Sequence, residues 1–282
     1  MQIAITGAAG RLGKAVVEYL RHDGHVLVGI DRLEPAEAVA GANMPYVQVD
    51  TTCYGALEDA MRGCDAVIHL AAHPSPHGYA DHQIHNENVV SSYNVLSAAA
   101  QLGISRVCLA SSVNAIGGAF SRSPRYDYFP VDEQHPTYSE DPYSLSKWIC
   151  EAQADMFARR DPGITVASLR FHALVCDYED GVRIASNRGD ASVRDLWGYT
   201  TFESAARACL LSLTANFQGH EVFYIVAPRT ASASPSAELC ETFYPDVEIR
   251  SELDGHRSFF DSSKAGRLLG WEHDILSAPG FA

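Results

Sequence analysis

Short apolar runs alternate with longer segments whose apolar residues recur every three or four positions along the first 170 residues. The short runs predict β-strands and the longer segments predict α-helices. Strands are expected at residues 2–6, 26–30, 46–49, 66–70, 106–110 and 165–170, and helices at 11–21, 56–61, 85–102 and 142–159. This alternation predicts an α/β fold with a doubly wound parallel sheet, the Rossmann fold.

The pattern changes after residue 170. Helical periodicity returns at 202–213, 236–243 and 263–269, with one further strand at 221–226. Residues 176–194 are rich in charge, Gly and Asn, which is typical of a loop that shapes a site. We therefore expect a dinucleotide-binding Rossmann core at 1–170 and a small mixed substrate-binding region at 171–282.

Composition narrows the classes of partner. The formal net charge of −14 disfavours nucleic acid and anionic membranes, and no apolar run is long enough to span a bilayer. The first predicted strand begins at residue 2, so no signal peptide is expected. Seven scattered cysteines with no C-x-x-C pair argue against disulfides and a cysteine zinc site, and favour a cytoplasmic protein without a metal.

A glycine-rich turn follows the first predicted strand and opens the first predicted helix. It reads Gly7-Ala8-Ala9-Gly10-Arg11-Leu12-Gly13, with the spacing G-x-x-G-x-x-G. Glycines at such a turn let backbone N–H groups approach a pyrophosphate at the positive end of a helix. The turn predicts a dinucleotide site that includes Gly7, Gly10, Arg11, Leu12 and Gly13.

Asp31 ends the second predicted strand, where an acidic residue accepts hydrogen bonds from the adenosine ribose. It favours NAD over NADP. Two alternatives stay open: Asp31 is an ordinary acid in a surface turn, or its neighbour Arg32 binds a 2′-phosphate instead.

Tyr143 and Lys147 stand four residues apart at the start of a predicted helix, so both project from one face. A neighbouring positive charge should lower the pKa of a tyrosine and let it act as a general acid or base. Ser111 and Ser112 follow the strand at 106–110, where a hydroxyl could polarise a substrate oxygen. Tyr143, Lys147 and Ser112 are the predicted catalytic residues, although an exposed helix pair and a turn serine remain the simpler interpretations.

These motifs resemble the extended short-chain dehydrogenase/reductases, the NAD-dependent epimerase/dehydratase group. The matching segments are TGAAGRLG at 6–13, HLAA at 69–72, NVV at 88–90, SS at 111–112, YSLSK at 143–147 and DSSKAGRLLGW at 261–271. The resemblance implies that Asp50 faces the adenine, that Lys147 holds the nicotinamide ribose, and that the chain forms a homodimer through helices 85–102 and 142–159. It also places five further cofactor contacts along the cleft, at Thr51, Leu70, Ala71, Ala72 and Asn88.

The substrate region departs from the nucleotide-sugar members of this family. Val113-Asn114 follows the serine pair, Phe171-His172-Ala173 replaces a segment with a substrate-binding asparagine, and the C-terminal part is short. The chain is in these respects more similar to uronate dehydrogenases, which oxidise a free sugar acid. Substrate candidates are His73, Ser111 and Asn114, with Arg183, Arg188 or Arg194 available for a carboxylate.

Three functions stay open. The first is an NAD-dependent oxidoreductase acting on a hydroxyl or carbonyl of a sugar or sugar acid. The second is a sugar epimerase or dehydratase that uses the same residues. The third is a non-catalytic dinucleotide sensor, which would need the glycine turn but not Tyr143, Lys147 and Ser112 together.

Overall fold

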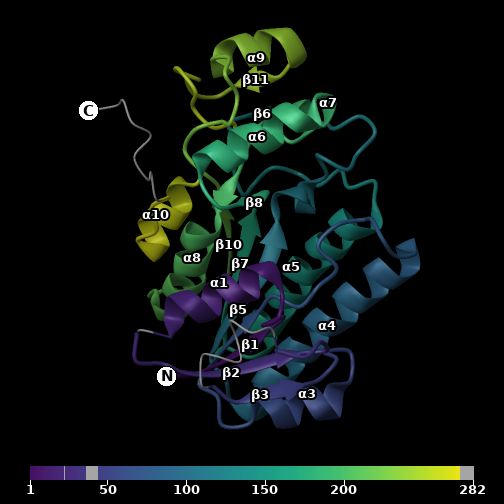
Figure 1. Ribbon diagram of the computed structural model, residues 1–282, viewed down its shortest axis with the longest axis vertical. Coiled ribbons are helices and arrows are strands. Elements are labelled where there is room, and N and C mark those ends of the chain that lie inside the picture. The colour runs from purple at the N-terminus through teal and green to yellow at the C-terminus, as the bar shows by residue number, and fades with distance from the viewer. Residues whose placement is uncertain (22, 36–43, 274–282) are drawn as a thin grey trace.

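The computed structural model describes residues 1–21, 23–35 and 44–273, and its centre is a seven-stranded parallel sheet (Figure 1). The strands are β1 (Gln2–Thr6), β2 (Val26–Asp31), β3 (Tyr46–Gln48), β4 (Ala66–His69), β5 (Arg106–Ser112), β7 (Thr165–Phe171) and β10 (Gly219–Ile225). Their order in space is β10-β7-β5-β4-β1-β2-β3. The order reverses between β1 and β4, and in such sheets the crevice beyond the strand ends at this point binds the ligand.

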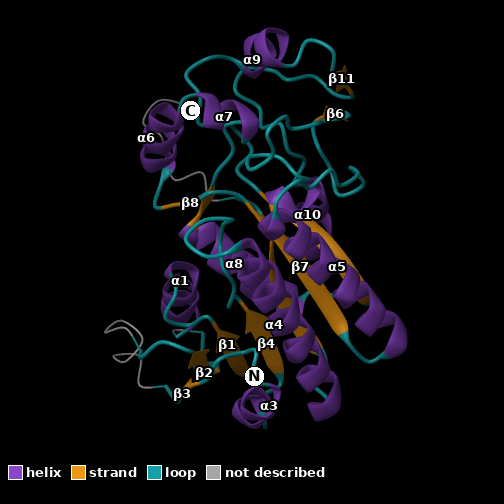
Figure 2. Cartoon of the chain, turned by 90° about the vertical axis from the view of Figure 1, so that its right-hand side faces the viewer, coloured by secondary structure: helices purple, strands orange, loops and turns teal. Residues whose placement is uncertain are grey.

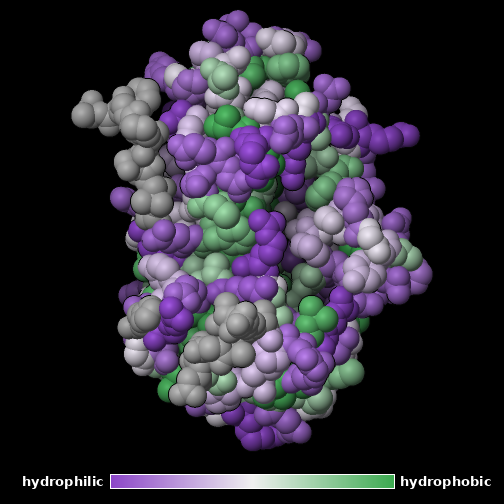
Figure 3. All heavy atoms as spheres, in the orientation of Figure 1, coloured by the Kyte–Doolittle hydropathy of each residue, from purple (hydrophilic) through white to green (hydrophobic). Residues whose placement is uncertain are grey.

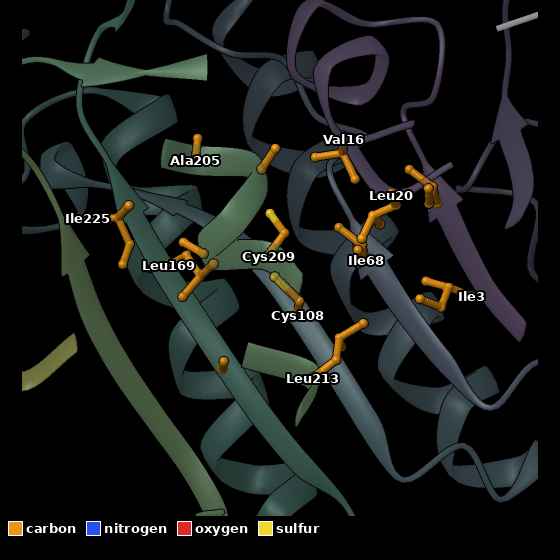
Figure 4. Close-up of a cluster of buried hydrophobic side chains, with 14 of the residues drawn as sticks. Ile3, Val16, Leu20, Ile68, Cys108, Leu169, Ala205, Cys209, Leu213 and Ile225 are labelled. Atoms are coloured by element: carbon orange, nitrogen blue, oxygen red, sulfur yellow. The ribbon is translucent and has the colours of Figure 1, made fainter. Parts of the chain in front are cut away.

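Helices cover both faces of the sheet (Figure 2). The helices are α1 (Arg11–Leu20), α3 (Tyr54–Met61), α4 (Asp81–Leu102), α5 (Pro142–Arg160), α8 (Phe202–Thr214) and α10 (Ser263–Leu269). Helices α1, α8 and α10 pack on one face and α3, α4 and α5 on the other. Successive strand residues serve opposite faces, since Ile3 and Ile5 join the first cluster and Ala4 the second. Figure 4 shows part of the first cluster.

The rest of the chain forms the upper part of the molecule in Figure 1. It contains the 3₁₀ helix η1 (Val113–Ile116), helices α6 (Tyr178–Arg188), α7 (Asp190–Arg194) and α9 (Ser236–Phe243), and the short strand pairs β6 (Tyr128–Phe129) with β11 (Glu248–Ile249) and β8 (Leu174–Val175) with β9 (Thr200–Thr201). Residues after 170 therefore serve two places, because β10, α8 and α10 return to the sheet. The division at residue 170 stays a prediction.

The seven strands and seven helices predicted from the sequence are all present, with ends shifted by a few residues. The largest shift is in α4, which begins at Asp81 rather than at residue 85. Gln83 explains the earlier start, because its side-chain oxygen accepts a hydrogen bond from the N–H of Ala80 at 3.3 Å.

The prediction of a loop at 176–194 is wrong, because most of this stretch is helical. Asp177 caps α6 by accepting the N–H of Asp180 at 2.8 Å, and two acidic residues occupy the first turn. Gly181 lies within this helix, where an added Cβ atom would be in ordinary van der Waals contact with the ring of Tyr199, at 3.4 Å. The N-cap and the acidic first turn are local signals for the start of a helix. The charge-rich composition of the stretch suggested a loop instead.

The surface is largely polar and hollowed near its centre (Figure 3). Over the described parts of the chain, no helix is both long and apolar enough to cross a membrane. Within the same residues, no group of three or more His, Cys, Asp or Glu side chains could hold a metal ion.

Candidate functional site

The glycine turn forms a cradle between β1 and α1 that side chains would fill. A Cβ atom on Gly7, whose φ is +71°, would lie 2.7 Å from the backbone nitrogen of Ala71. A Cβ atom on Gly13 would overlap the carbonyl oxygen of Gly7 and lie 2.8 Å from the Cα of Ala8. Glycine is therefore required for the close approach of α1 to the turn.

The amino end of α1 is open to an anion. Gly10 stands at the N-cap position and provides no side-chain cap, and the first turn contains no acidic residue. Its N–H groups and the positive end of the helix dipole thus remain available for a phosphate. Arg11 adds a positive charge beside them, with its guanidinium 4.9 Å from the ring centre of Phe202. This cradle fits the diphosphate of a dinucleotide.

An adenosine-sized pocket of about 200 Å³ lies on the β2 side of the turn. Asp31 borders it and accepts the N–H groups of Ala9 and Leu33, both at 3.0 Å, which fixes its carboxylate next to the turn. Asp50 borders it as well. Burial alone would raise the pKa of the Asp50 carboxyl, but hydrogen bonds from the backbone and side chain of Thr52 outweigh it and lower that pKa.

A buried hydrogen-bond chain supports the floor between β1, β4 and α4. Thr6 Oγ1 accepts the N–H groups of Leu70 at 3.2 Å and Ala71 at 3.3 Å, so its own hydrogen points to His69 Nδ1 at 2.7 Å. The remaining nitrogen of His69 faces Ser91, which contacts Thr51 at 2.6 Å. Burial lowers the pKa of His69 to about 3, so this ring stays neutral. The hydroxyl of Thr51 is thereby engaged within the protein.

Asn88 makes three hydrogen bonds within the protein. Its side-chain oxygen accepts the N–H of His73 at 2.7 Å, and its amide donates to His73 O at 3.2 Å and Ser146 Oγ at 3.0 Å. Asn88 borders the adenosine pocket, but these three contacts hold the β4–α4 loop against α5. The contact of Asn88 with the cofactor stays a prediction.

A second cavity of about 790 Å³ continues from the glycine turn toward α6 and α7. Ser112 at the end of β5 and Tyr143 at the start of α5 lie on its wall. Lys147 Nζ donates to Ala110 O at 2.7 Å and lies 5.7 Å from the ring centre of Tyr143. The three residues predicted to be catalytic thus share one cavity with the glycine turn.

The expected lowering of the Tyr143 pKa is not found. Burial raises the pKa of Tyr143 to about 12, and the hydrogen bond with Ser112 opposes this rise only in part. Burial also lowers the pKa of Lys147, while Cys150 and Glu151 oppose that change. Desolvation dominates both shifts because both side chains are enclosed, and Lys147 is turned to the carbonyl of Ala110.

The two serines of β5 have different partners. Ser111 Oγ donates to Glu151 Oε1 at 2.6 Å, and Glu151 forms two hydrogen bonds with the buried guanidinium of Arg170 at 2.9 and 2.7 Å. Ser112 Oγ instead accepts the N–H of Asn114 at 3.1 Å. Ser111 borders the cavity but its hydroxyl is used within the protein, whereas Ser112 is available beside Tyr143.

The remaining substrate candidates lie in different places. Asn114 borders the larger cavity and accepts the N–H of Ala119 at 2.9 Å, whereas His73 borders the adenosine pocket and bonds Glu87 at 2.7 Å. Arg183 is not brought to either cavity, because its side chain is 65% exposed and pairs with Asp180.

Arg188 and Arg194 line the far end of the larger cavity instead. Arg188 pairs with the carboxylate of Asp195, and Arg194 Nη1 donates to Ser121 O at 3.3 Å. Sequence reasoning did not identify Phe120, which packs edge-on against Tyr143 with ring centres 5.7 Å apart and continues to His77 over the same distance. An aromatic residue in a loop has no periodic sequence pattern, so the sequence does not show whether it lines a cavity or packs in the core.

Comparisons with known proteins agree with this geometry. Residues 3–187 match the model of the NAD dependent epimerase/dehydratase family. An L-arabinose 1-dehydrogenase (NAD(P)(+)) of Haloferax volcanii is 30% identical over 70% of this chain and 76% of its own length. A uronate dehydrogenase of Pseudomonas putida is 30% identical over 60% of this chain, which spans 59% of that relative's length.

Among solved structures, the UDP-glucose 4-epimerase of Thermotoga maritima superposes with a TM-score of 0.73 at 22% identity, covering 98% of this chain and 94% of that one. This likeness supports the Rossmann fold. The family match covers most of the sheet, the glycine turn and the Tyr143–Lys147 helix, so NAD is the cofactor that the cradle would hold. The chain is an enzyme that belongs to the NAD-dependent epimerase/dehydratase family.

Proposed function

We propose that this enzyme is a dehydrogenase that oxidises a hydroxyl group of a sugar or sugar acid with NAD. The observation that carries the proposal is that Ser112, Tyr143 and Lys147 lie on the wall of the same cavity as the glycine turn. This arrangement places proton-transferring groups next to the end of the cleft that would receive the nicotinamide.

Each residue has a distinct role in the proposed reaction. When bound, NAD supplies the acceptor for hydride. Tyr143 Oη, in its ionised form, accepts the proton of the substrate hydroxyl, and Ser112 Oγ, which lines the same cavity, orients the same substrate oxygen. Lys147 provides a buried positive charge on the next turn of α5, where it favours the anionic form of the phenol once its hydrogen bond to Ala110 O is exchanged for a ligand.

The far end of the cavity supports an anionic substrate. Arg188 and Arg194 border it, although the whole chain carries a net charge of −14. A guanidinium binds a carboxylate through two parallel hydrogen bonds, and it is less costly to desolvate than an ammonium group. A uronate fits these two ends, with its hydroxyl at Tyr143 and its carboxylate at the arginines.

The test is steady NADH formation from NAD with a panel of free aldoses, uronates and UDP-sugars. We expect turnover with at least one free sugar or uronate, and a loss of about 100-fold or more in kcat for Tyr143→Phe. Tyr138→Phe is a matched control, since it removes a phenol that bonds Asp127 outside the cavity. Full activity of Tyr143→Phe would refute the catalytic role of Tyr143, whereas no turnover with any member of the panel would favour a dinucleotide sensor.

A sugar epimerase is the second candidate. The cavity of about 790 Å³ favours it, because this space exceeds what the nicotinamide and a monosaccharide need and leaves room for a larger substrate. An epimerase would convert a UDP-sugar to its epimer without net NADH, which product analysis by NMR distinguishes from dehydrogenation.

We further propose a homodimer through α4 and α5. Val90 and Tyr93 on α4 and Leu145 and Trp148 on α5 are exposed apolar side chains on two helices that pack side by side. A cytoplasmic location also belongs to the proposal and is supported by the seven cysteines, all of which are free thiols. Sedimentation of the wild type and of Trp148→Glu tests the dimer, since the charge should yield monomers.

A further inference from the structure

The mouth of the adenosine pocket contains a salt bridge that spans it. Arg32 follows β2, Glu87 lies on α4, and Arg32 Nη1 approaches Glu87 Oε2 to 3.5 Å. We propose that Glu87 is a cofactor-specificity residue, which holds Arg32 away from the adenosine ribose and so prevents it from binding a 2′-phosphate. The proposal rests on the NAD site and is independent of the sugar substrate.

Arg32 is the residue that a 2′-phosphate would need. Between residues 26 and 61 it is the only lysine or arginine in the sequence. It directly follows Asp31, whose carboxylate is fixed by Ala9 and Leu33 at the place where the ribose hydroxyls bind. A phosphate at the 2′ position would therefore face the negative charge of Asp31 and depend on Arg32 for compensation.

The backbone of Arg32 is fixed, so only its side chain can change position. Gln48 Nε2 donates to Arg32 O at 3.0 Å. The backbone of the following residue, Leu33, is hydrogen-bonded at both its N–H and its carbonyl: the N–H donates to Asp31, and the carbonyl accepts from Tyr46 at 2.7 Å. The guanidinium itself is bonded only to Glu87 among the described residues, and it remains 47% exposed. Its direction is thus set by which anion attracts it.

Glu87 is itself anchored. The same oxygen, Oε2, lies 2.7 Å from Nε2 of the buried His73, and His73 is fixed through its backbone to Asn88. The carboxylate cannot follow Arg32 toward the ribose without giving up the histidine. It also adds a third negative charge to the pocket, beside Asp31 and Asp50, which opposes a phosphate by Coulomb repulsion.

Binding of small ligands tests this role without turnover. Titration calorimetry with 2′,5′-ADP and 5′-ADP gives the ratio of the two affinities for the wild type, Glu87→Gln, Arg32→Gln and the double variant. Glutamine retains a group that can bond His73 but has no charge. We expect Glu87→Gln to shift the ratio toward 2′,5′-ADP by about two- to fivefold, the size of an exposed charge pair. We expect no such gain in the double variant.

Glu18→Gln is the matched control, because it removes the same charge from an exposed pair with Arg21 that borders neither cavity. Its ratio should equal that of the wild type. An unchanged ratio in Glu87→Gln would overturn the proposal. A gain of equal size in the double variant would overturn it too, since repulsion by Glu87 would then act without Arg32.

Discussion

Replacing Glu151 by Gln should weaken the fold and change the environment of Lys147 in one step. The side chains of Glu151 and Arg170 are only 7% and 5% exposed, and two hydrogen bonds join them. Ser111 donates to the same carboxylate, and Tyr224 lies 3.1 Å from the guanidinium. The substitution leaves the positive charge of Arg170 buried without its hydrogen-bonded counter-charge.

The expected loss of stability follows from that burial. Breaking a buried ion pair by removing one partner costs about 3–5 kcal/mol, against a total stability of about 5–15 kcal/mol for a protein of this kind. Glutamine keeps one oxygen that can accept from Arg170 Nε or Ser111, so the lower end, about 3 kcal/mol, is expected. Lys147 also loses a charge that opposes the lowering of its pKa.

Urea unfolding of the wild type and Glu151→Gln measures the loss directly. Glu18→Gln serves as the control, because its partner Arg21 is exposed and a surface pair contributes only about 0–1 kcal/mol. The double variant Glu151→Leu/Arg170→Leu removes both members of the pair, so its stability should exceed that of Glu151→Gln. A cost below about 1 kcal/mol for Glu151→Gln would refute the view that this pair holds β5 and α5 together.

Three further outcomes are expected. Gly13→Ala should weaken 5′-ADP binding at least about tenfold, measured by calorimetry, and lower the free energy of unfolding by about 1–3 kcal/mol through overpacking, measured by urea unfolding. Gly55→Ala should change neither quantity, because the space around Gly55 is open. Burial lowers the folded-state pKa of His69 to about 3 and also lowers that of His172, so unfolding takes up protons. The free energy of unfolding should keep its full value above about pH 6.5 and fall by about 1.4 kcal/mol per pH unit per histidine on acidification. His69→Gln should remove the contribution of one histidine from this slope. Because the pKa of Tyr143 is about 12, the rate of substrate oxidation at low, non-saturating substrate should still rise at pH 9, and a plateau beginning below pH 8 would show that another group limits the reaction.

The sheet and the glycine turn could be predicted because their signals are local. Strands buried on both faces read as continuous apolar runs, and all seven runs form the sheet. The turn requires glycine at positions where backbone atoms approach each other, which is visible in the sequence itself. Tyr143 and Lys147 needed only helical spacing to be placed on one face of α5.

The substrate end could not be predicted in the same way. Arg183, Arg188 and Arg194 are equivalent in the sequence, and only the packing of α6 and α7 turns the latter two toward the cavity and leaves Arg183 in solvent. The link between Arg32 and Glu87 joins residues 55 positions apart. The raised pKa of Tyr143 depends on enclosure by residues such as Phe120, which no spacing rule reveals.

The two serines of β5 show how strand geometry assigns chemistry that sequence leaves shared. Successive residues of a strand point to opposite faces, so Ser111 and Ser112 point in different directions. Glu151 takes the hydroxyl of Ser111 because α5 covers that face and carries Glu151 one turn after Lys147. Ser112 is left at the strand end, where η1 begins and its oxygen receives the N–H of Asn114. Because the oxygen of Ser112 accepts this bond, its own hydrogen is left to be donated to an oxygen in the cavity. The ion pair behind β5 therefore contributes to the proposed reaction by occupying Ser111 and leaving a single serine beside the phenol.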